Sequence, residues 1–326
     1  MHGCPHCPIG SVDRASPRPA PYKILSPWMD SRTPLRTCAS FDMPAGACDA
    51  HVHMIGDKQR FPISATRSYT PGEASLEQLN VLRNAFGLDR VVLVQPSFYG
   101  TDNACLLDAL KRLGSCARGI VVIDEQVTDA ELERMNESGI RGIRINPKGF
   151  PSDHARIADL AQRISIRVAP YGWHVQAFLP LSTVAVLHRT LAGLHAPIVL
   201  DHFAGASADG LDQPGLESLF KLLDSGNCYV KLSAPYHAAR SAPYYPEMLS
   251  LAHALIARRS DRILWGSNWP HTNAKPVQGI SALEVSPFRD VDNAALINLV
   301  SAWAPDAEIR TKILVDNPAA LFAFPR

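Results

Sequence analysis

The feature that most limits the possible folds of this chain is a regular alternation of short apolar runs with amphipathic segments, which begins at Gly46. The amphipathic segments carry helix signals: Ser75 and Gln78 form the pattern of a capping box before a helical segment, and Gly87 follows that segment. The apolar runs are rich in valine and isoleucine, which is typical of parallel strands covered by helices on both sides. Eight such strands are predicted, at 48–53, 90–95, 117–123, 140–146, 172–177, 198–202, 229–233 and 262–266.

A strand followed by a helix, repeated eight times, predicts the α/β fold of a TIM barrel. A doubly wound open sheet is the structural alternative, but no glycine-rich phosphate-binding sequence follows the first strand. We expect a distorted (β/α)8 barrel as a single domain over residues 46–326. A proline-rich N-terminal extension over residues 1–45 precedes it, and we expect this extension to be flexible.

The N-terminal extension contains Cys4 and Cys7 in the sequence CPHC, which resembles half of a zinc site. No second pair follows at the spacing of a zinc site, so a tail without metal is the better interpretation. The seven cysteines of the chain are an odd number scattered through a large protein. This pattern favours reduced thiols and a cytoplasmic location.

The charge of the chain limits its possible partners. A formal net charge of +1 gives no long-range attraction to nucleic acid or to an anionic membrane. No apolar run approaches the roughly 18 residues that a membrane span needs. We therefore expect a small-molecule partner, and the sequence leaves open whether the chain forms a homo-oligomer.

Polar side chains occupy almost every predicted strand end, which is where a TIM barrel carries its catalytic groups. The sequence HVH places His51 and His53 on one side of the first strand, which suits metal ligation or two donors to one oxygen. Asp201 and Lys231 also lie at strand ends, and no role is assigned to them. The other candidates are Ser97, Arg141, Arg144, His174, Gln176, His202, Tyr236, Asn268 and His271.

Three of these candidates need a choice between alternatives. Arg141 and Arg144 differ in strand parity, so we expect only one of them to point inward, and Arg144 is the stronger candidate. His202 taken alone is more often a hydrogen-bonded core residue than a catalytic group.

Several segments together resemble the amidohydrolase superfamily, and in particular its amidohydrolase-related branch: GACDAHVHMIG, FPISATRSYTP, VVLVQPSFYGTDN, GIRGIRIN, WHVQ, LDHFAG, NCYVKLSAPY, LWGSNWPH and DNPAALF. The resemblance covers the chain from about Gly46 to its end and implies an enzyme acting on a small lactone that bears carboxylates. It implies that His51, His53 and His202 polarise the lactone carbonyl. It also implies a set of substrate contacts: Tyr69, Ser97, Tyr99, Arg141, Arg144, His174, Gln176, Tyr236 and His237.

The chain departs from the pattern of this branch at two positions. Asn268 stands where the resemblance implies an aspartate that activates water, and an amide has no basicity that would serve this purpose. His237 stands where the pattern offers an arginine. Because Asn268 also removes an anionic ligand, we expect no required metal. The alternative is one divalent ion, zinc or manganese, held by His51, His53 and either His174 or His202.

Four functions remain open at this point. The main hypothesis is a hydrolase that opens a carboxylate-bearing lactone, with water activated by His271 or His237 and oriented by Asn268. A lactone isomerase is the alternative, because an attacking substrate hydroxyl needs positioning more than a strong base. The third is a lactonase that an aspartate-to-asparagine exchange has inactivated, so that it only binds its substrate. The fourth is a binding or regulatory protein.

Overall fold

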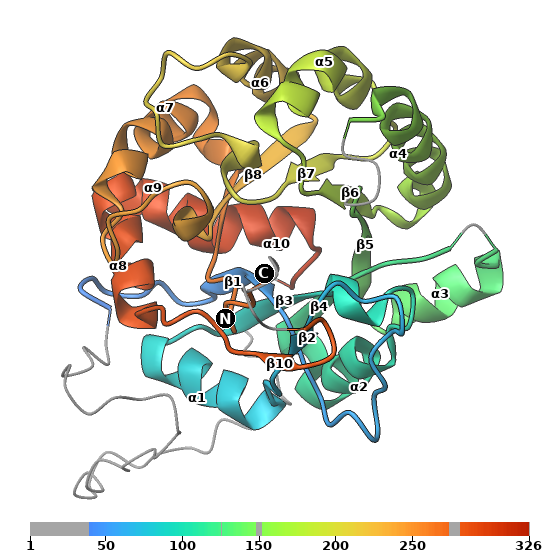
Figure 1. Cartoon of the computed structure of the whole chain (residues 1–326). Coiled ribbons are helices and arrows are strands. Elements are labelled where there is room, and N and C mark those ends of the chain that lie inside the picture. Colours follow the sequence, from blue (N-terminus) through green and yellow to red (C-terminus); the bar gives the residue numbers. More distant parts are fainter. Residues whose placement is uncertain (1–38, 125, 148–151, 274–280, 326) are drawn as a thin grey trace, which may run out of the picture.

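The computed structural model describes residues 39–124, 126–147, 152–273 and 281–325, which form a barrel of parallel strands (Figure 1). Eight strands follow one another around it in chain order: β1 (Cys48–Val52), β3 (Arg90–Val94), β4 (Ala117–Val121), β5 (Ile140–Ile145), β6 (His174–Ala177), β7 (Ile198–Leu200), β8 (Cys228–Ser233) and β9 (Ile263–Gly266). The predicted barrel and its strands are confirmed. The predicted extension, including Cys4 and Cys7, lies for the most part outside the described residues.

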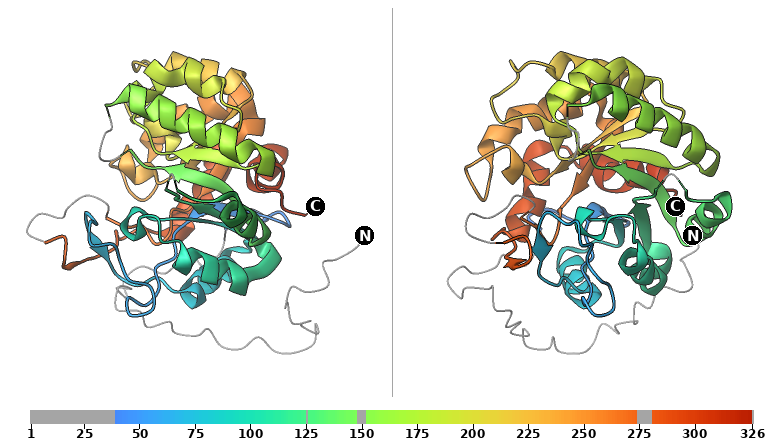
Figure 2. Two further views of the ribbon diagram at one scale, coloured as in Figure 1. Left: turned by 90° about the vertical axis from the view of Figure 1, so that its right-hand side faces the viewer. Right: turned by 45° about the vertical axis from the view of Figure 1, so that its right-hand side comes forward.

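Helices surround the strands on the outside of the barrel (Figures 1 and 2). The predicted capping box is confirmed, because Ser75 and Gln78 exchange side chain-to-backbone hydrogen bonds and Gly87 ends the helix at φ 67°. No helix within the described ranges has the length and apolar character needed to cross a membrane. The helices are α1 (Leu76–Phe86), α2 (Ala104–Leu113), α3 (Asp129–Glu137), α4 (His154–Val168), α5 (Leu181–Ala192), α6 (Leu216–Asp224), α7 (Leu249–Arg259), α8 (Asn293–Trp303), α9 (Ala307–Thr311) and α10 (Asn317–Leu321).

The C-terminal segment closes the end of the barrel where the strands begin. Phe322 and Phe324 join an apolar cluster with interior residues such as Val92 and Ile120. Arg118, near the start of β4, donates from Nε to the carbonyl of Phe322 at 3.1 Å and from Nη2 to that of Ala323 at 2.9 Å. With this end filled, the opposite end is the one that remains for substrate.

The barrel closes between β1 and β9 through only a few backbone contacts. The N–H of Asn268 donates to the carbonyl of His51 at 2.9 Å, and the N–H of His53 donates to the carbonyl of Trp269 at 2.8 Å. Gly266 lets the two strands approach, because an added Cβ would lie 2.6 Å from the Cβ of His51. This seam therefore fixes His51 and Asn268 relative to each other.

A buried carboxylate completes the seam. Asp49 Oδ1 accepts hydrogen bonds from the backbone N–H groups of His51 at 3.1 Å and Ser267 at 2.9 Å. Burial raises the pKa of Asp49 to about 6, although the hydrogen bonds from Ser267 oppose this shift. The side chain thus accepts hydrogen bonds from one backbone group on each side of the seam.

Two short strands lie in the loops on the C-terminal side of the barrel. β2 (Thr70–Pro71) follows β1, β10 (Val285–Ser286) follows β9, and the two pair in parallel. Thr70 Oγ1 also donates to the carbonyl of Ala282 at 2.7 Å. These contacts hold the first and last loops together beside the strand ends.

Candidate active site

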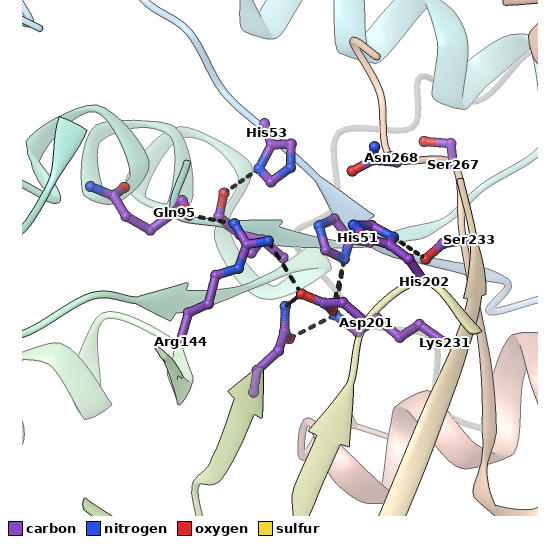
Figure 3. A network of polar contacts seen from close by, with 12 residues as sticks. His51, His53, Gln95, Arg144, Asp201, His202, Lys231, Ser233, Ser267 and Asn268 are labelled. Carbon is purple, nitrogen blue, oxygen red and sulfur yellow. Dashed lines mark hydrogen bonds and ion pairs between the residues drawn. The ribbon is translucent and has the colours of Figure 1, made fainter. Parts of the chain in front are cut away.

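Three imidazoles meet at the C-terminal end of the barrel, and we call His51, His53 and His202 the histidine cluster (Figure 3). The ring centroid of His51 lies 4.9 Å from that of His53 and 4.9 Å from that of His202. All three side chains are buried. The structure thus brings together residues that are far apart in the chain.

Asp201 lies at the base of the histidine cluster, within reach of four side chains (Figure 3). Its Oδ1 is 3.2 Å from His51 Nδ1, and its Oδ2 accepts from Arg144 Nη2 at 3.3 Å and Gln176 Nε2 at 3.2 Å. Burial alone would raise the pKa of Asp201, but His51, Lys231 and Arg144 hold it well below its usual range. Asp201 is therefore a carboxylate at neutral pH.

Lys231 supplies a buried positive charge beside this carboxylate. Its Nζ donates to Gln176 Oε1 at 2.7 Å and lies 3.7 Å from Asp201 Oδ1 and 3.4 Å from His51 Nδ1. Burial lowers the pKa of Lys231 to about 8, against the attraction of Asp201. The sequence left Asp201 and Lys231 without roles, although the signal for Lys231 was visible: a lysine inside the otherwise apolar run YVKL.

The hydrogen bonds of His51 and His53 determine which ring nitrogens carry protons. His53 Nδ1 lies 2.8 Å from the carbonyl of Val94, which can only accept, so Nδ1 carries the proton. His51 Nδ1 lies 3.2 Å from Asp201 Oδ1 and 3.4 Å from Lys231 Nζ, and we assign the proton to Nδ1 because the contact with the carboxylate is the shorter one. Burial lowers the pKa of His51 to about 4 and that of His53 well below its usual range, so both rings are neutral. Each therefore presents Nε2 as a lone pair.

These assigned tautomers differ from one expectation from the sequence. Neutral His51 and His53 offer acceptors at Nε2, so they do not donate hydrogen bonds to a carbonyl oxygen as the resemblance implied. His202 differs, because its Nδ1 lies 2.8 Å from the hydroxyl of Ser233, which can donate. When Nδ1 accepts from this hydroxyl, His202 carries its proton on Nε2 and can act as the donor of the histidine cluster.

Asn268 lies above the histidine cluster, and its amide is held from one side (Figure 3). Nδ2 donates to the hydroxyl of Tyr236 at 2.8 Å, and that hydroxyl lies 3.1 Å from His271 Nδ1. Asn268 Oδ1 is buried and has no partner among the described residues. The amide therefore has one unused acceptor at the site.

His271 does not fit the role of base that was considered for it. Its Nδ1 contacts Tyr236 and its Nε2 lies 2.9 Å from Asn293 Oδ1, so both nitrogens are occupied. Burial lowers the pKa of His271 to about 4, as it does for His51, so the occupied nitrogens and not the basicity exclude this role. The other candidate, His237, is exposed, and its ring centroid lies 5.1 Å from that of His202.

Arg144 and Tyr69 are two further candidates for contact with the substrate, and both side chains are buried. Arg144 points inward, donates from Nη1 to the carbonyl of Gln95 at 3.2 Å, and has a buried Nε with no partner in the described part of the chain. Tyr69 is buried, and its hydroxyl donates to Thr272 Oγ1 at 3.2 Å. Ser97 begins a short 3-10 turn that follows β3. Burial raises the pKa of the Tyr69 hydroxyl, and Thr272, Arg144 and Ser97 oppose this shift.

Arg141 and Tyr99 are not brought to the site, which corrects their predicted roles as substrate contacts. Arg141 lies on the other face of β5 and donates to the carbonyls of Asn136 at 2.9 Å and Ile140 at 2.6 Å. The hydroxyl of Tyr99 accepts from the N–H of Gly56 at 3.2 Å, and its ring belongs to the outer core. Odd and even positions of a strand point to opposite faces, so Arg141 points away from the barrel interior when Arg144 points into it.

His174 and Gln176 also take roles other than the predicted ones. His174 lies deeper in the barrel, where its ring centroid is 5.3 Å from that of Phe322, so it does not join the histidine cluster. It fits there because Gly142, its partner in register on β5, has no side chain. Gln176 uses its amide to hold Asp201 and Lys231 and is therefore a support of the site.

Three side chains could serve as metal ligands, but the charges around them disfavour a metal ion. His51, Asp201 and His202 offer ligand atoms that all lie within 4.8 Å of one another. The same carboxylate is already neutralised by Arg144 at 3.3 Å and Lys231 at 3.7 Å. A divalent cation here would lie next to two existing cations.

Comparison with known proteins identifies several relatives of the whole barrel. The chain is 32% identical over 292 residues to a 2-pyrone-4,6-dicarboxylate hydrolase of Comamonas testosteroni, covering 86% of this chain and 92% of the relative. It is 33% identical to a 4-sulfomuconolactone hydrolase of Rhizobium radiobacter, with coverages of 87% and 92%. It is 28% identical to a D-galactarolactone isomerase of Agrobacterium fabrum, with coverages of 86% and 91%.

The fold and a family model agree with these relatives. A crystal structure from Pseudomonas putida, of a protein assigned as a 2-pyrone-4,6-dicarboxylic acid hydrolase, matches with a TM-score of 0.69 and 32% identity over 87% of this chain and 100% of that chain. A family model described as amidohydrolase matches residues 48–324 of this chain, which is nearly the whole barrel. The chain therefore belongs to the amidohydrolase family.

Proposed function

We propose that this enzyme hydrolyses a small lactone that bears carboxylates. The observation that carries the proposal is the pairing of buried, neutral His51 with the carboxylate of Asp201, which leaves His51 Nε2 as a lone pair in the site. Relatives above 30% identity are named as a 2-pyrone-4,6-dicarboxylate hydrolase and a 4-sulfomuconolactone hydrolase, which supports the same reaction.

In this proposal His51 is the general base. Its Nε2 takes a proton from water while Asp201 holds Nδ1–H and stabilises the imidazolium that forms. The resulting hydroxide oxygen attacks the lactone carbonyl, and the C–O bond of the ring then breaks. The proton on His51 passes to the departing ring oxygen, so the base is regenerated. This arrangement makes an acid at position 268 unnecessary, since Asn268 Oδ1 only has to accept a hydrogen bond from the water.

The charge that develops on the carbonyl oxygen needs a donor, and His202 is the residue that offers one. Its Nδ1 contacts the hydroxyl of Ser233, which leaves the proton on Nε2 when that hydroxyl donates, and such donors contribute roughly 3 kcal/mol each in comparable sites. Arg144 binds a carboxylate of the substrate through its unused Nε, with Tyr69 and Ser97 beside it. Tyr236 and exposed His237, in the turn after β8, are the other candidates for contact with the substrate.

We propose that the reaction requires no metal. Arg144 and Lys231 already neutralise Asp201, and Asn268 is a neutral amide, so the residues do not fit a resident divalent cation. Elemental analysis of the purified protein should show no stoichiometric zinc or manganese, and dialysis against a chelator should leave the rate unchanged. Loss of activity on chelation, restored by one of these ions, would contradict this.

A panel of carboxylate-bearing lactones in water enriched in oxygen-18 tests the function. Hydrolysis should release acid and place one oxygen-18 atom in the new carboxylate. If the protein turned over none of the lactones, the proposed function would be wrong. Product of the same mass as the substrate, with no oxygen-18, would instead show an isomerase.

The isomerase is the second candidate, and the amide of Asn268 is the observation that favours it. A substrate hydroxyl is held next to the carbonyl by binding, so positioning contributes much of the rate and a weaker base suffices. The relative named as a D-galactarolactone isomerase supports this candidate. The oxygen-18 experiment separates the two reactions in a single measurement.

We also propose a cytoplasmic location for the enzyme. Among the described residues, Cys48, Cys105 and Cys228 are buried thiols without a disulfide. Such cysteines are typical of proteins in a reducing compartment.

A further inference from the structure

Four side chains from three segments form a hydrogen-bonded chain that ends at the active site, and we call Asn293, His271, Tyr236 and Asn268 the amide relay. Asn293 begins α8 and places its Oδ1 2.9 Å from His271 Nε2. His271 Nδ1 lies 3.1 Å from the hydroxyl of Tyr236. Asn268 Nδ2 donates to the same hydroxyl at 2.8 Å.

The chemistry of the groups gives this relay a single direction. The amide oxygen of Asn293 only accepts, so His271 carries its proton on Nε2 and has a lone pair on Nδ1. Tyr236 then donates its O–H to His271 Nδ1 and uses its oxygen to accept from Asn268. Burial lowers the pKa of His271 to about 4, and Arg289 acts in the same sense, so the ring stays neutral.

The relay leaves Asn268 Oδ1 as the group that faces the active site. This oxygen is buried and has no partner among the described residues. Figure 3 shows the amide next to His51 and His53, which present their own lone pairs. If the amide of Asn268 were rotated, its NH2 group would lie there instead. The N–H would then donate a hydrogen bond to the attacking oxygen, and this would occupy the lone pair with which that oxygen attacks the carbonyl carbon.

We propose that Tyr236, His271 and Asn293 are positioning residues that hold the amide of Asn268 with Oδ1 toward the histidine cluster, where it accepts a hydrogen bond from the attacking O–H group. This inference rests on the proposed function, and it applies equally to water and to a substrate hydroxyl. A carboxylate would need no such device, because both of its oxygens accept. The relay is thus the adaptation that allows an amide at position 268.

The direction of the relay can be measured on the full chain without substrate. Long-range nitrogen–proton NMR distinguishes the two neutral tautomers of histidine, and the His271→Gln variant identifies the signal of His271. We expect the Nε2–H tautomer in the parent and in Asn293→Asp, which keeps an acceptor, and a mixture of tautomers in Asn293→Leu. An Nδ1–H tautomer or an imidazolium in the parent would overturn the proposal.

Kinetics on a lactone that the parent opens provides the second test. Tyr236→Phe and Asn293→Leu should each lower kcat about tenfold or more and leave KM within about twofold, because the amide loses its fixed orientation. Asn293→Asp should stay within about threefold of the parent. Equal losses in Asn293→Asp and Asn293→Leu at similar Tm would overturn the relay. A parent that opens no lactone would contradict the proposed function, while the NMR measurement would still decide the relay.

Discussion

At the scale of single residues, the chemical character of each active-site histidine depends on the partner of one ring nitrogen. Asp201 orients His51, the carbonyl of Val94 orients His53, and Ser233 orients His202. The three rings lie close together and yet have different abilities to donate and accept. The partner of each ring therefore explains its role better than the histidine itself does.

We expect two buried histidines of the barrel interior to respond differently to substitution. His51→Gln should lower kcat at least a hundredfold, because the site loses its base. His174→Gln is the matched control, since His174 contacts Phe322 at the other end, and its kcat/KM should stay within about threefold of the parent. Steady-state hydrolysis of one lactone measures both. Similar losses of activity in both variants would exclude His51 as the general base.

The sequence predicted much of the site at this scale, but only part of its chemistry. The strand-end pattern and the family resemblance located the histidine cluster, Arg144 and Asn268. They did not predict the tautomers, because a proton position depends on partners such as Val94 that carry no functional signal. They also placed Arg141 and Tyr99 at the site, since a single sequence shows which face a side chain occupies only through strand parity.

At the scale of secondary-structure elements, the seam between β1 and β9 does the most to position the site. Two backbone hydrogen bonds and the carboxylate of Asp49 connect these strands. His51, His53 and Asn268 all lie on or directly beside this seam. The stability of the seam and the geometry of the active site are therefore linked.

Substitution of Asp49 should show this link. Asp49→Ala leaves the backbone N–H groups of His51 and Ser267 buried without an acceptor, which should lower the free energy of unfolding by about 2–4 kcal/mol. Asp49→Asn keeps one acceptor and should lose less. Urea unfolding measures both, and kcat should fall with stability. A stability equal to that of the parent in Asp49→Ala would show that the seam does not depend on this side chain.

The C-terminal segment gives a second prediction for an element. Phe322→Ala should lower the free energy of unfolding by about 3–5 kcal/mol, because a large side chain leaves the barrel interior. Phe322→Leu fills most of the space and should lose less. Activity at a temperature where both variants are folded should match the parent, since Phe322 lies at the end opposite the site. Reduced kcat in folded Phe322→Ala would contradict that separation.

The long or regular elements could be predicted from the sequence, and the shortest ones could not. The eight barrel strands and the capped helix at Ser75 have periodic or local signals that extend over several residues. β2 and β10 contain two residues each, so they have no periodicity to detect. Their pairing depends on the meeting of loops that are far apart in the chain.

At the scale of the whole molecule, the buried neutral histidines make stability depend on pH. Burial lowers the pKa of His271 to about 4 and that of His174 to about 3 in the folded chain, whereas an unfolded histidine titrates near 6.5. As the pH falls from 6.5 toward 4, the unfolded chain binds protons that the folded chain does not, so stability falls. As the pH falls through this range, each such histidine lowers the free energy of unfolding by about 1.4 kcal/mol per pH unit.

We therefore expect the urea midpoint to fall between pH 7 and pH 5, and His271→Gln to reduce this slope. The exposed His195→Gln is the control for the number of histidines, and its slope should match that of the parent. Asp49 acts in the opposite direction, because its raised pKa favours the folded chain at lower pH. A midpoint that is constant or rises on acidification would contradict the burial of neutral histidines.

The close approach at Gly266 has a consequence for how this enzyme can be altered. Even the smallest side chain at this position would collide with His51, so the imidazole of His51 can occupy its place only because residue 266 has no side chain. In a saturation library, position 266 should tolerate exchange as poorly as the imidazoles do, although it offers no reactive group. Attempts to redirect the enzyme toward new lactones should leave this glycine untouched and vary the loop residues at the entrance instead.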